Sequence, residues 1–169
     1  MALDPTDAAI VEAQLGRQPR GGVAVAWRCP CGNPGVVMTA PRLPDGTPFP
    51  TTYYLTCPNA IKACSTLEGS GVMAHMSDRL QSDTVLAGQY ADAHDSYLED
   101  RQMLAISLGI DVREITGISA GGMPLRVKCL HALTAHALAK GPGVNPLGDE
   151  VVATIADFWR TACLQLEPL

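Results

Sequence analysis

GGVAVAWRCPCGNPGVVMTA, residues 21–40, contains two strand-like runs joined by a turn with the spacing Cys-x-Cys-Gly. Valine-rich runs are typical of β-strands, because branched side chains pack well on a pleated surface. A third run, TTYYLTC at residues 51–57, is the most strand-like in the chain, and a proline-rich loop at residues 41–50 leads into it. Within that loop the residues Pro44-Asp45-Gly46 are typical of a turn. We therefore expect a small three-stranded antiparallel sheet.

Helical patterns dominate the rest of the chain. A first helix is predicted to begin at Pro5, with Asp4 as its N-cap and Gly16 as its stop signal. After Cys57, helical patterns cover five further segments: 58–71, 71–81, 82–109, 124–141 and 149–166. The expected fold class is α+β, mostly helical with a small three-stranded sheet, and residues 1–169 are expected to form a single domain.

Composition and charge exclude several classes of protein. The chain has 169 residues, of which 47% are hydrophobic, so it can build one core without disulfides. Its formal net charge of -5 argues against a general nucleic-acid or anionic-membrane surface, since both need a basic footprint. The N-terminus carries acids where a signal peptide carries basic residues, and no apolar run reaches the roughly 18 residues that cross a bilayer. We expect a cytoplasmic protein with no nucleic-acid or membrane partner.

Three of the six cysteines are predicted to meet as metal ligands beside the sheet. Cys29 and Cys31 flank a turn closed by Gly32, and the backbone amides of such a turn can point at thiolate sulfur. The two cysteines are too close in sequence to form an unstrained disulfide with each other. Cys57 precedes Pro58 and is placed as the N-cap of the next helix, where the helix dipole favours a thiolate. These three thiols can meet if their strands are neighbours.

The fourth ligand is expected from the helix predicted to begin at Pro124. On that helix Cys129 and His131 fall on opposite borders of the apolar stripe, so a regular helix cannot point both at one ion. Cys129 is the favoured ligand, and His131 is the alternative ligand or a catalytic base. His136 lies two turns further along and at most lines the same pocket or serves as a base.

Cys64 and Cys163 are expected to be core residues. Cys64 follows Ile61 by three positions on one predicted helix, and Cys163 follows Trp159 by four on the apolar stripe of the last one. Free cysteine packs as a small hydrophobic residue, so neither thiol is expected to be a ligand.

Two metal groups suit the ligand set Cys29, Cys31, Cys57 and Cys129. Four thiolates fit a tetrahedral zinc ion, which is slightly favoured, and the same ligands satisfy an iron-sulfur cluster. The ligands are scattered along the chain instead of forming two local Cys-x-x-Cys pairs. This spacing makes an iron-sulfur cluster or an open, reactive site more plausible than it would be for two such pairs. The alternative is a set of thiols without metal, because cysteine is often simply buried.

A candidate anion site includes Gly121 and Gly122. These glycines immediately precede the predicted helix start, and Arg126 and Lys128 lie in the first turns of that helix. Unpaired helix amides, the helix dipole and two cations together favour binding of a small anionic ligand. The alternative interpretation is a helix start with solvated cations.

Three sequence blocks resemble one known family. The blocks are RCPCGNP at 28–34, PRLPDGTPFPTTYYLTCP at 41–58 and GGMPLRVKCLHALTAHALAKGPGVNPLGDE at 121–150. Together they resemble a bacterial family, common in actinobacteria, that is catalogued as domain of unknown function 501, and the likeness runs from about Gly16 to the last helix. The resemblance implies a complete family member in the bacterial cytoplasm. It brings no established activity, cofactor or catalytic residue.

The sequence therefore favours one function and leaves two others open. The first is a protein with a cysteine-based metal site, on which the sheet and the helix from Pro124 converge. The second is a thiol- or metal-dependent enzyme, in which Cys57 or Cys129 acts with a nearby histidine on a small anionic substrate. His131 or His136 could serve Cys57 from across the fold, whereas neither is well placed on its helix to reach Cys129. The third is a scaffold or interaction protein that uses the proline-rich loop, residues 41–50, as its exposed contact.

Overall fold

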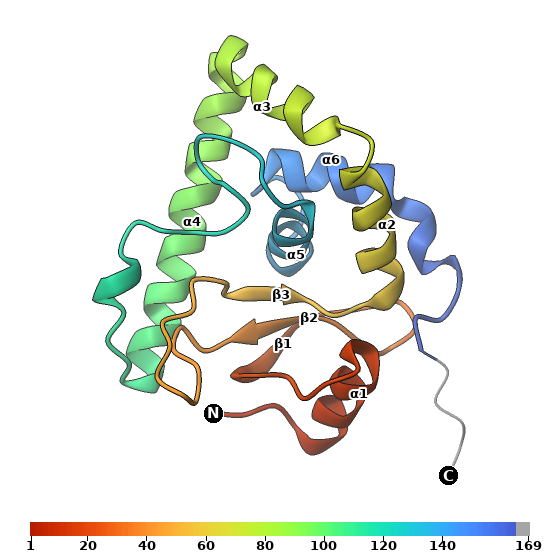
Figure 1. The fold of residues 1–169 in the computed structure, drawn as a ribbon, viewed down its shortest axis with the longest axis vertical. Coiled ribbons are helices and arrows are strands. Elements are labelled where there is room, and N and C mark those ends of the chain that lie inside the picture. The colour runs from red at the N-terminus through yellow and green to blue at the C-terminus, as the bar shows by residue number, and fades with distance from the viewer. Residues whose placement is uncertain (165–169) are drawn as a thin grey trace.

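The computed structural model describes residues 1–164 and has a three-stranded sheet with helices packed around it (Figure 1). The strands are antiparallel and lie in the order β1 (Gly22–Arg28), β2 (Pro34–Thr39) and β3 (Tyr53–Leu55). The described residues form six α-helices: α1 (Pro5–Leu15), α2 (Pro58–Glu68), α3 (Val72–Ser82), α4 (Thr84–Leu108), α5 (Leu130–Lys140) and α6 (Pro146–Thr154). Two short 3-10 helices follow α4 and α6: η1 (Arg113–Ile115) and η2 (Ala156–Arg160). The predicted α+β class is confirmed.

The central strand β2 is the most buried part of the sheet. Val36 lies opposite Trp27 of β1 and Leu55 of β3, and its side chain is fully buried. Helix α1 also contacts β2, and Figure 1 places it away from the group formed by α2 to α6. The start and stop signals predicted for α1 are present, because Asp4 caps its first turn and Gly16 ends it in a left-handed conformation.

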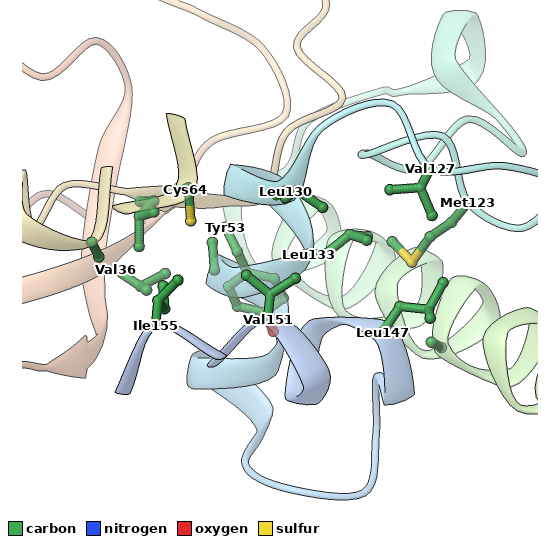
Figure 2. Packing of buried hydrophobic residues seen from close by; sticks show 14 of the residues in the cluster. Val36, Tyr53, Cys64, Met123, Val127, Leu130, Leu133, Leu147, Val151 and Ile155 are labelled. Carbon is green, nitrogen blue, oxygen red and sulfur yellow. The ribbon is translucent and has the colours of Figure 1, made fainter. Parts of the chain in front are cut away.

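The main hydrophobic core lies between the sheet, α5 and α6 (Figure 2). Helix α5 contributes Leu130 and Leu133, and α6 contributes Leu147 and Val151, all of them completely buried. The two helices approach closely because α6 has a glycine at its contact with α5. A Cβ atom on Gly148 would lie only 2.4 Å from the backbone oxygen of Leu133.

The long helix α4 is anchored to the sheet through buried tyrosines. The hydroxyl oxygen of Tyr97 accepts a hydrogen bond of 2.6 Å from the backbone amide of Thr52, immediately before β3. Tyr53 packs edge-on against Tyr97 and donates its own hydroxyl to Asp100 of α4 at 2.8 Å. These contacts fix the third strand against α4. Of the helices within residues 1–164, none has the combination of length and hydrophobicity that a bilayer crossing requires.

The helix predicted to begin at Pro124 instead begins at Leu130, so that prediction is wrong by almost two turns. Residues 121–128 form a closed loop, in which the amide of Lys128 donates to the carbonyl of Gly121 at 2.7 Å. Two neighbouring helices hold the loop. Ser77 of α3 accepts the amide of Val127 at 3.0 Å, and Tyr90 of α4 donates its hydroxyl to the carbonyl of Arg126 at 3.2 Å. These tertiary hydrogen bonds use backbone groups that a helix would need for itself.

The predicted last helix is also interrupted. Helix α6 ends at Thr154, η2 follows, and Cys163 lies in the irregular segment after it. The side chain of Asn59 in α2 donates to the carbonyls of Phe158 and Thr161, both at 3.1 Å. These carbonyls are thereby bonded to another part of the chain, which favours a turn there instead of a continuous helix. The last two residues of the predicted helix, 165 and 166, lie outside the described residues.

Candidate metal centre

The turn between β1 and β2 positions the first two thiols. Cys29 follows the last residue of β1, and its backbone amide donates to the carbonyl of Asn33 at 2.9 Å. The amide of Gly32 donates to the carbonyl of Cys29 at 2.8 Å. Gly32 has a φ of 90°, a conformation that glycine adopts without steric cost. The tight turn leaves the Cys29 side chain buried and that of Cys31 exposed.

The third thiol, that of Cys57, reaches the same end of the sheet from β3. Its backbone amide and that of Thr56 both donate to the carbonyl of Gly35 in β2, at 3.3 and 2.9 Å. Cys57 is the N-cap of α2, as its position before Pro58 predicts, and its side chain is fully buried. The hydrogen bonds to Gly35 therefore hold this thiol beside the β1–β2 turn.

The fourth thiol at this place belongs to Cys163. The sequence predicts instead that Cys163 is a hydrophobic-core residue on a continuous last helix. The C-terminal segment returns from η2 toward the β1–β2 turn, and there the side chain of Asn33 donates to the carbonyl of Leu164 at 3.3 Å (Figure 1). The sulfur atoms of Cys29, Cys57 and Cys163 all lie within 4.8 Å of one another. The sulfur of Cys31 lies 3.4 Å from that of Cys163. We call Cys29, Cys31, Cys57 and Cys163 the four-thiol cluster.

Two side-chain amides donate hydrogen bonds to the Cys163 sulfur, and burial opposes ionisation of this thiol. The side-chain amides of Gln14 in α1 and Asn33 both point N–H groups at the Cys163 sulfur, at 3.6 and 3.7 Å. Burial, and then the neighbouring Cys31 thiol, raise the pKa of Cys163 in the absence of an ion. Burial likewise raises the pKa of Cys29. A bound cation would compensate these costs, because a metal replaces the thiol proton and neutralises the thiolate charge.

Three of the four predicted ligands thus meet, and Cys129 does not join them. Cys29, Cys31 and Cys57 are together as expected, and Cys163 stands where Cys129 was expected. The local sequence does not indicate that Cys163 replaces Cys129, because residues 149–163 have the pattern of one amphipathic helix. The contacts of Asn59 with the carbonyls of Phe158 and Thr161, and of Asn33 with that of Leu164, hold the segment that carries Cys163 beside the other thiols.

Cys129 belongs to a separate group with Glu68 and His131. The ligand atoms of these three half-buried residues also lie within 4.8 Å of one another. The Cys129 sulfur is 3.9 Å from Nδ1 of His131, and that nitrogen is 3.0 Å from Oε1 of Glu68. The prediction that Cys129 and His131 point apart is wrong, because Cys129 is the N-cap of α5 and has extended backbone angles. Hydrogen bonding to Cys129 and then to Glu68 raises the pKa of His131 to about 9, against a smaller opposing effect of burial.

One family comparison identifies the chain. The sequence profile described as "Protein of unknown function (DUF501)" matches residues 25–153, which is well over half of the chain. The chain belongs to the DUF501 family. No curated protein and no solved structure gives a significant match to this DUF501 chain. The matched part contains three members of the four-thiol cluster and all of the Glu68–Cys129–His131 group, and it ends before Cys163.

His136 of the DUF501 chain lies in the core instead of beside the thiols. Its side chain is fully buried, stacks on Tyr53 with ring centroids 5.7 Å apart, and meets Tyr97 edge-on. Nδ1 is 3.2 Å from the side-chain nitrogen of Asn145, and Nε2 has no hydrogen-bond partner among residues 1–164. Burial lowers the pKa of His136 to about 4, with Asp100 partly opposing this shift.

The buried His136 should make the DUF501 protein less stable in mild acid. Its pKa is about 4 in the folded state and about 6.5 in an unfolded chain, so the unfolded state binds the proton first as the pH falls. Stability is therefore present above pH 6.5 and is lost toward pH 4. From pH 7 to pH 5 the free energy of unfolding should fall by about 2 kcal/mol from this residue alone. Urea denaturation at pH 7 and at pH 5 measures this change in the free energy of unfolding.

A His136→Phe variant isolates the contribution of this residue, since other acid-sensitive groups are unchanged. Its loss of stability between pH 7 and pH 5 should be about 2 kcal/mol smaller than that of wild type. His75 is exposed on α3, so His75→Gln is the matched control and should behave as wild type. An equal loss in wild type and His136→Phe would show that His136 does not titrate as a buried neutral group.

The predicted anion site lacks the helix start on which it depends. Gly121 and Gly122 lie in the closed loop before α5, where both have positive φ angles, of 68° and 94°. The loop itself uses the amides of Arg126 and Lys128, which donate to the carbonyls of Gly122 and Gly121. Both cationic side chains are exposed. The true N-terminus of α5 is occupied by Glu68, whose Oε1 accepts the amide of Leu130 at 2.7 Å.

Proposed function

We propose that this DUF501 protein binds one zinc ion through Cys29, Cys31, Cys57 and Cys163, and that the ion fastens the C-terminal segment to the sheet. The observation that supports it is the convergence of four sulfur atoms from three separate parts of the chain. The β1–β2 turn supplies two thiols, the β3–α2 junction supplies one, and the segment after η2 supplies the last. Uncharged thiols gain little from such close contact, whereas a shared cation explains it.

The short separations within the trio Cys29, Cys57 and Cys163 favour a single ion over an iron-sulfur cluster. Tetrahedral zinc with bonds of about 2.3 Å places its sulfur ligands about 3.8 Å apart. The sulfur atoms of Cys29, Cys57 and Cys163 all lie within 4.8 Å of one another, and the Cys31 sulfur joins them through its 3.4 Å separation from that of Cys163. A cluster distributes its thiolates over two or more iron atoms, so some of the sulfur atoms would lie farther apart than around one ion.

The ligand set also favours a structural role. Four protein ligands complete the tetrahedral shell of zinc, which leaves no position for a substrate or a water molecule. Three of the four thiols are buried. The ion would instead supply the contact that the C-terminal segment needs, because few apolar side chains after Phe158 are buried within the described residues.

The test is the zinc content of purified protein and of single serine variants. Cys29→Ser, Cys31→Ser, Cys57→Ser and Cys163→Ser should each contain one zinc per chain less than wild type, measured by mass spectrometry of the metal. Cys64→Ser is the matched control, since this buried thiol lies outside both cysteine groups and contacts Thr134. It should keep the wild-type content.

Two results would contradict the proposal. One is an unchanged zinc content in Cys163→Ser, which would leave the C-terminal thiol without a ligand role. The other is a brown protein that contains iron and shows thiolate-to-iron absorption after purification without oxygen. That result would replace zinc by an iron centre at the same thiols.

A further inference from the structure

The Glu68–Cys129–His131 group combines three kinds of metal ligand at the junction of two helices. Glu68 is the last residue of α2, Cys129 is the N-cap of α5, and His131 is the second residue of α5. The carboxylate is fixed by its hydrogen bond to the amide of Leu130, and this bond places Oε1 beside Nδ1 of His131. Backbone groups of Leu130 and Ile61 thus orient two of the three half-buried donors.

His131 is oriented in the way that a metal ligand usually is. Its Nε2 atom lies 3.2 Å from the carbonyl oxygen of Ile61 and 3.2 Å from the hydroxyl of Ser65, both on α2. A carbonyl can only accept, so Nε2 carries the proton and donates it. Metal-bound histidines typically donate their second ring N–H to a carbonyl or carboxylate, which fixes the other nitrogen as the ligand. Here that other nitrogen, Nδ1, faces Cys129 and Glu68, and a bound cation would displace the proton that Nδ1 donates to Glu68.

The distances suit a zinc ion placed between the three atoms. Around tetrahedral zinc, a nitrogen and an oxygen ligand lie about 3.4 Å apart, and a sulfur and a nitrogen about 3.6 Å apart. The observed separations are 3.0 Å for Nδ1 to Oε1 and 3.9 Å for Nδ1 to the Cys129 sulfur. Shifts of a few tenths of an ångström would complete the site.

A cavity of about 320 Å³ lies beside two of these ligands. Cys129 and His131 line it together with Thr51 and with apolar and aromatic side chains: Tyr53, Tyr54, Leu55, Ile61 and Ala132. Among the described residues that line this cavity there is no aspartate, glutamate, lysine or arginine. A ligand entering it would meet the metal at one end and an apolar wall at the other.

We propose that Glu68, Cys129 and His131 form a second zinc site whose fourth coordination position is open to this cavity. Three protein ligands with one exchangeable position are the arrangement of reactive zinc sites, whereas four thiolates are the arrangement of structural ones. The open position accepts a water molecule, or a small ligand with one donor atom and an apolar body. This site is independent of the four-thiol cluster, because the two groups share no residue.

Metal counting distinguishes the two sites. After chelation and reloading with zinc alone, wild type should bind two ions per chain. Cys129→Ser and Glu68→Gln should each bind one, and Cys64→Ser should still bind two. Glu68→Gln keeps an oxygen that can accept the amide of Leu130, so its helical circular dichroism should match that of wild type. One ion in wild type that Cys129→Ser and Glu68→Gln both retain, or two ions in both ligand variants, would overturn the second site.

The open position has its own test in cobalt-loaded protein. Azide should change the visible absorption of wild type and of Cys163→Ser, which retains the second site, and should leave Cys129→Ser unchanged. An unaltered wild-type spectrum at millimolar azide would show that the site is closed and would overturn the reactive assignment. If Cys129→Ser loses one zinc ion while Cys163→Ser keeps the wild-type zinc content, the four-thiolate proposal is wrong and the second site is supported.

Discussion

Cys163→Ser should lose most of the stability that the four-thiolate zinc ion gives to wild type. The folded chain holds four thiols together, whereas the unfolded chain does not, so the binding energy of the ion is also folding energy. With free zinc at about 1,000 times the dissociation constant, the ion adds about 4 kcal/mol to the free energy of unfolding. Removing one thiolate should eliminate nearly all of this increment.

The measurement is guanidinium denaturation of both proteins, each with zinc and after chelation. Chelated wild type and chelated Cys163→Ser should differ little, because the substitution is small and Cys163 lies near the end of the described chain. Zinc should then stabilise wild type by about 4 kcal/mol more than it stabilises the variant. A second zinc site contributes to both proteins and cancels from this difference. Equal increments would show that the C-terminal thiol does not bind the ion.

Gly148→Ala should destabilise the protein by about 3 kcal/mol, at the upper end of the usual cost of overpacking. The added methyl group would lie 2.4 Å from the carbonyl oxygen of Leu133 and 2.8 Å from the Cβ of Ala137. Both obstacles belong to α5 and one is backbone, so no side-chain rotation can relieve the clash. Helices α5 and α6 must separate, which would loosen the core around Leu133 and Leu147.

Gly88→Ala is the matched control for this prediction. Gly88 is exposed in the second turn of α4, and a Cβ there would have no heavy atom within 4 Å. Alanine is a better helix former than glycine, so the control should gain about 0.5 to 1 kcal/mol. Thermal and urea denaturation compare the two variants. A Gly148→Ala protein as stable as wild type would mean that the α5–α6 contact is looser than described.

The sequence by itself determined the elements whose signals are local. Asp4, Pro5 and Gly16 delimit α1 through side-chain capping and glycine geometry, which depend on a few neighbouring residues. The strand-like runs flanking Cys29 and Cys31 gave β1 and β2 for the same reason. Three members of the four-thiol cluster follow directly, because β1 and β3 both run antiparallel to the central strand β2 and therefore finish at the same end of the sheet.

The tertiary structure decided where Cys129 and Cys163 go. The sequence pattern predicts that both cysteines lie within helices. In the structure each lies outside the predicted helix, because other parts of the chain form hydrogen bonds with the backbone groups that the helix would need. Ser77 accepts an amide of the loop before α5, and Asn59 binds carbonyls at the end of η2. A single hydrogen bond contributes about 1 kcal/mol, which is comparable to the summed helix preference of a few residues. Contacts between residues some 50 and 100 positions apart therefore decided which thiol joins the cluster, and no local pattern records them.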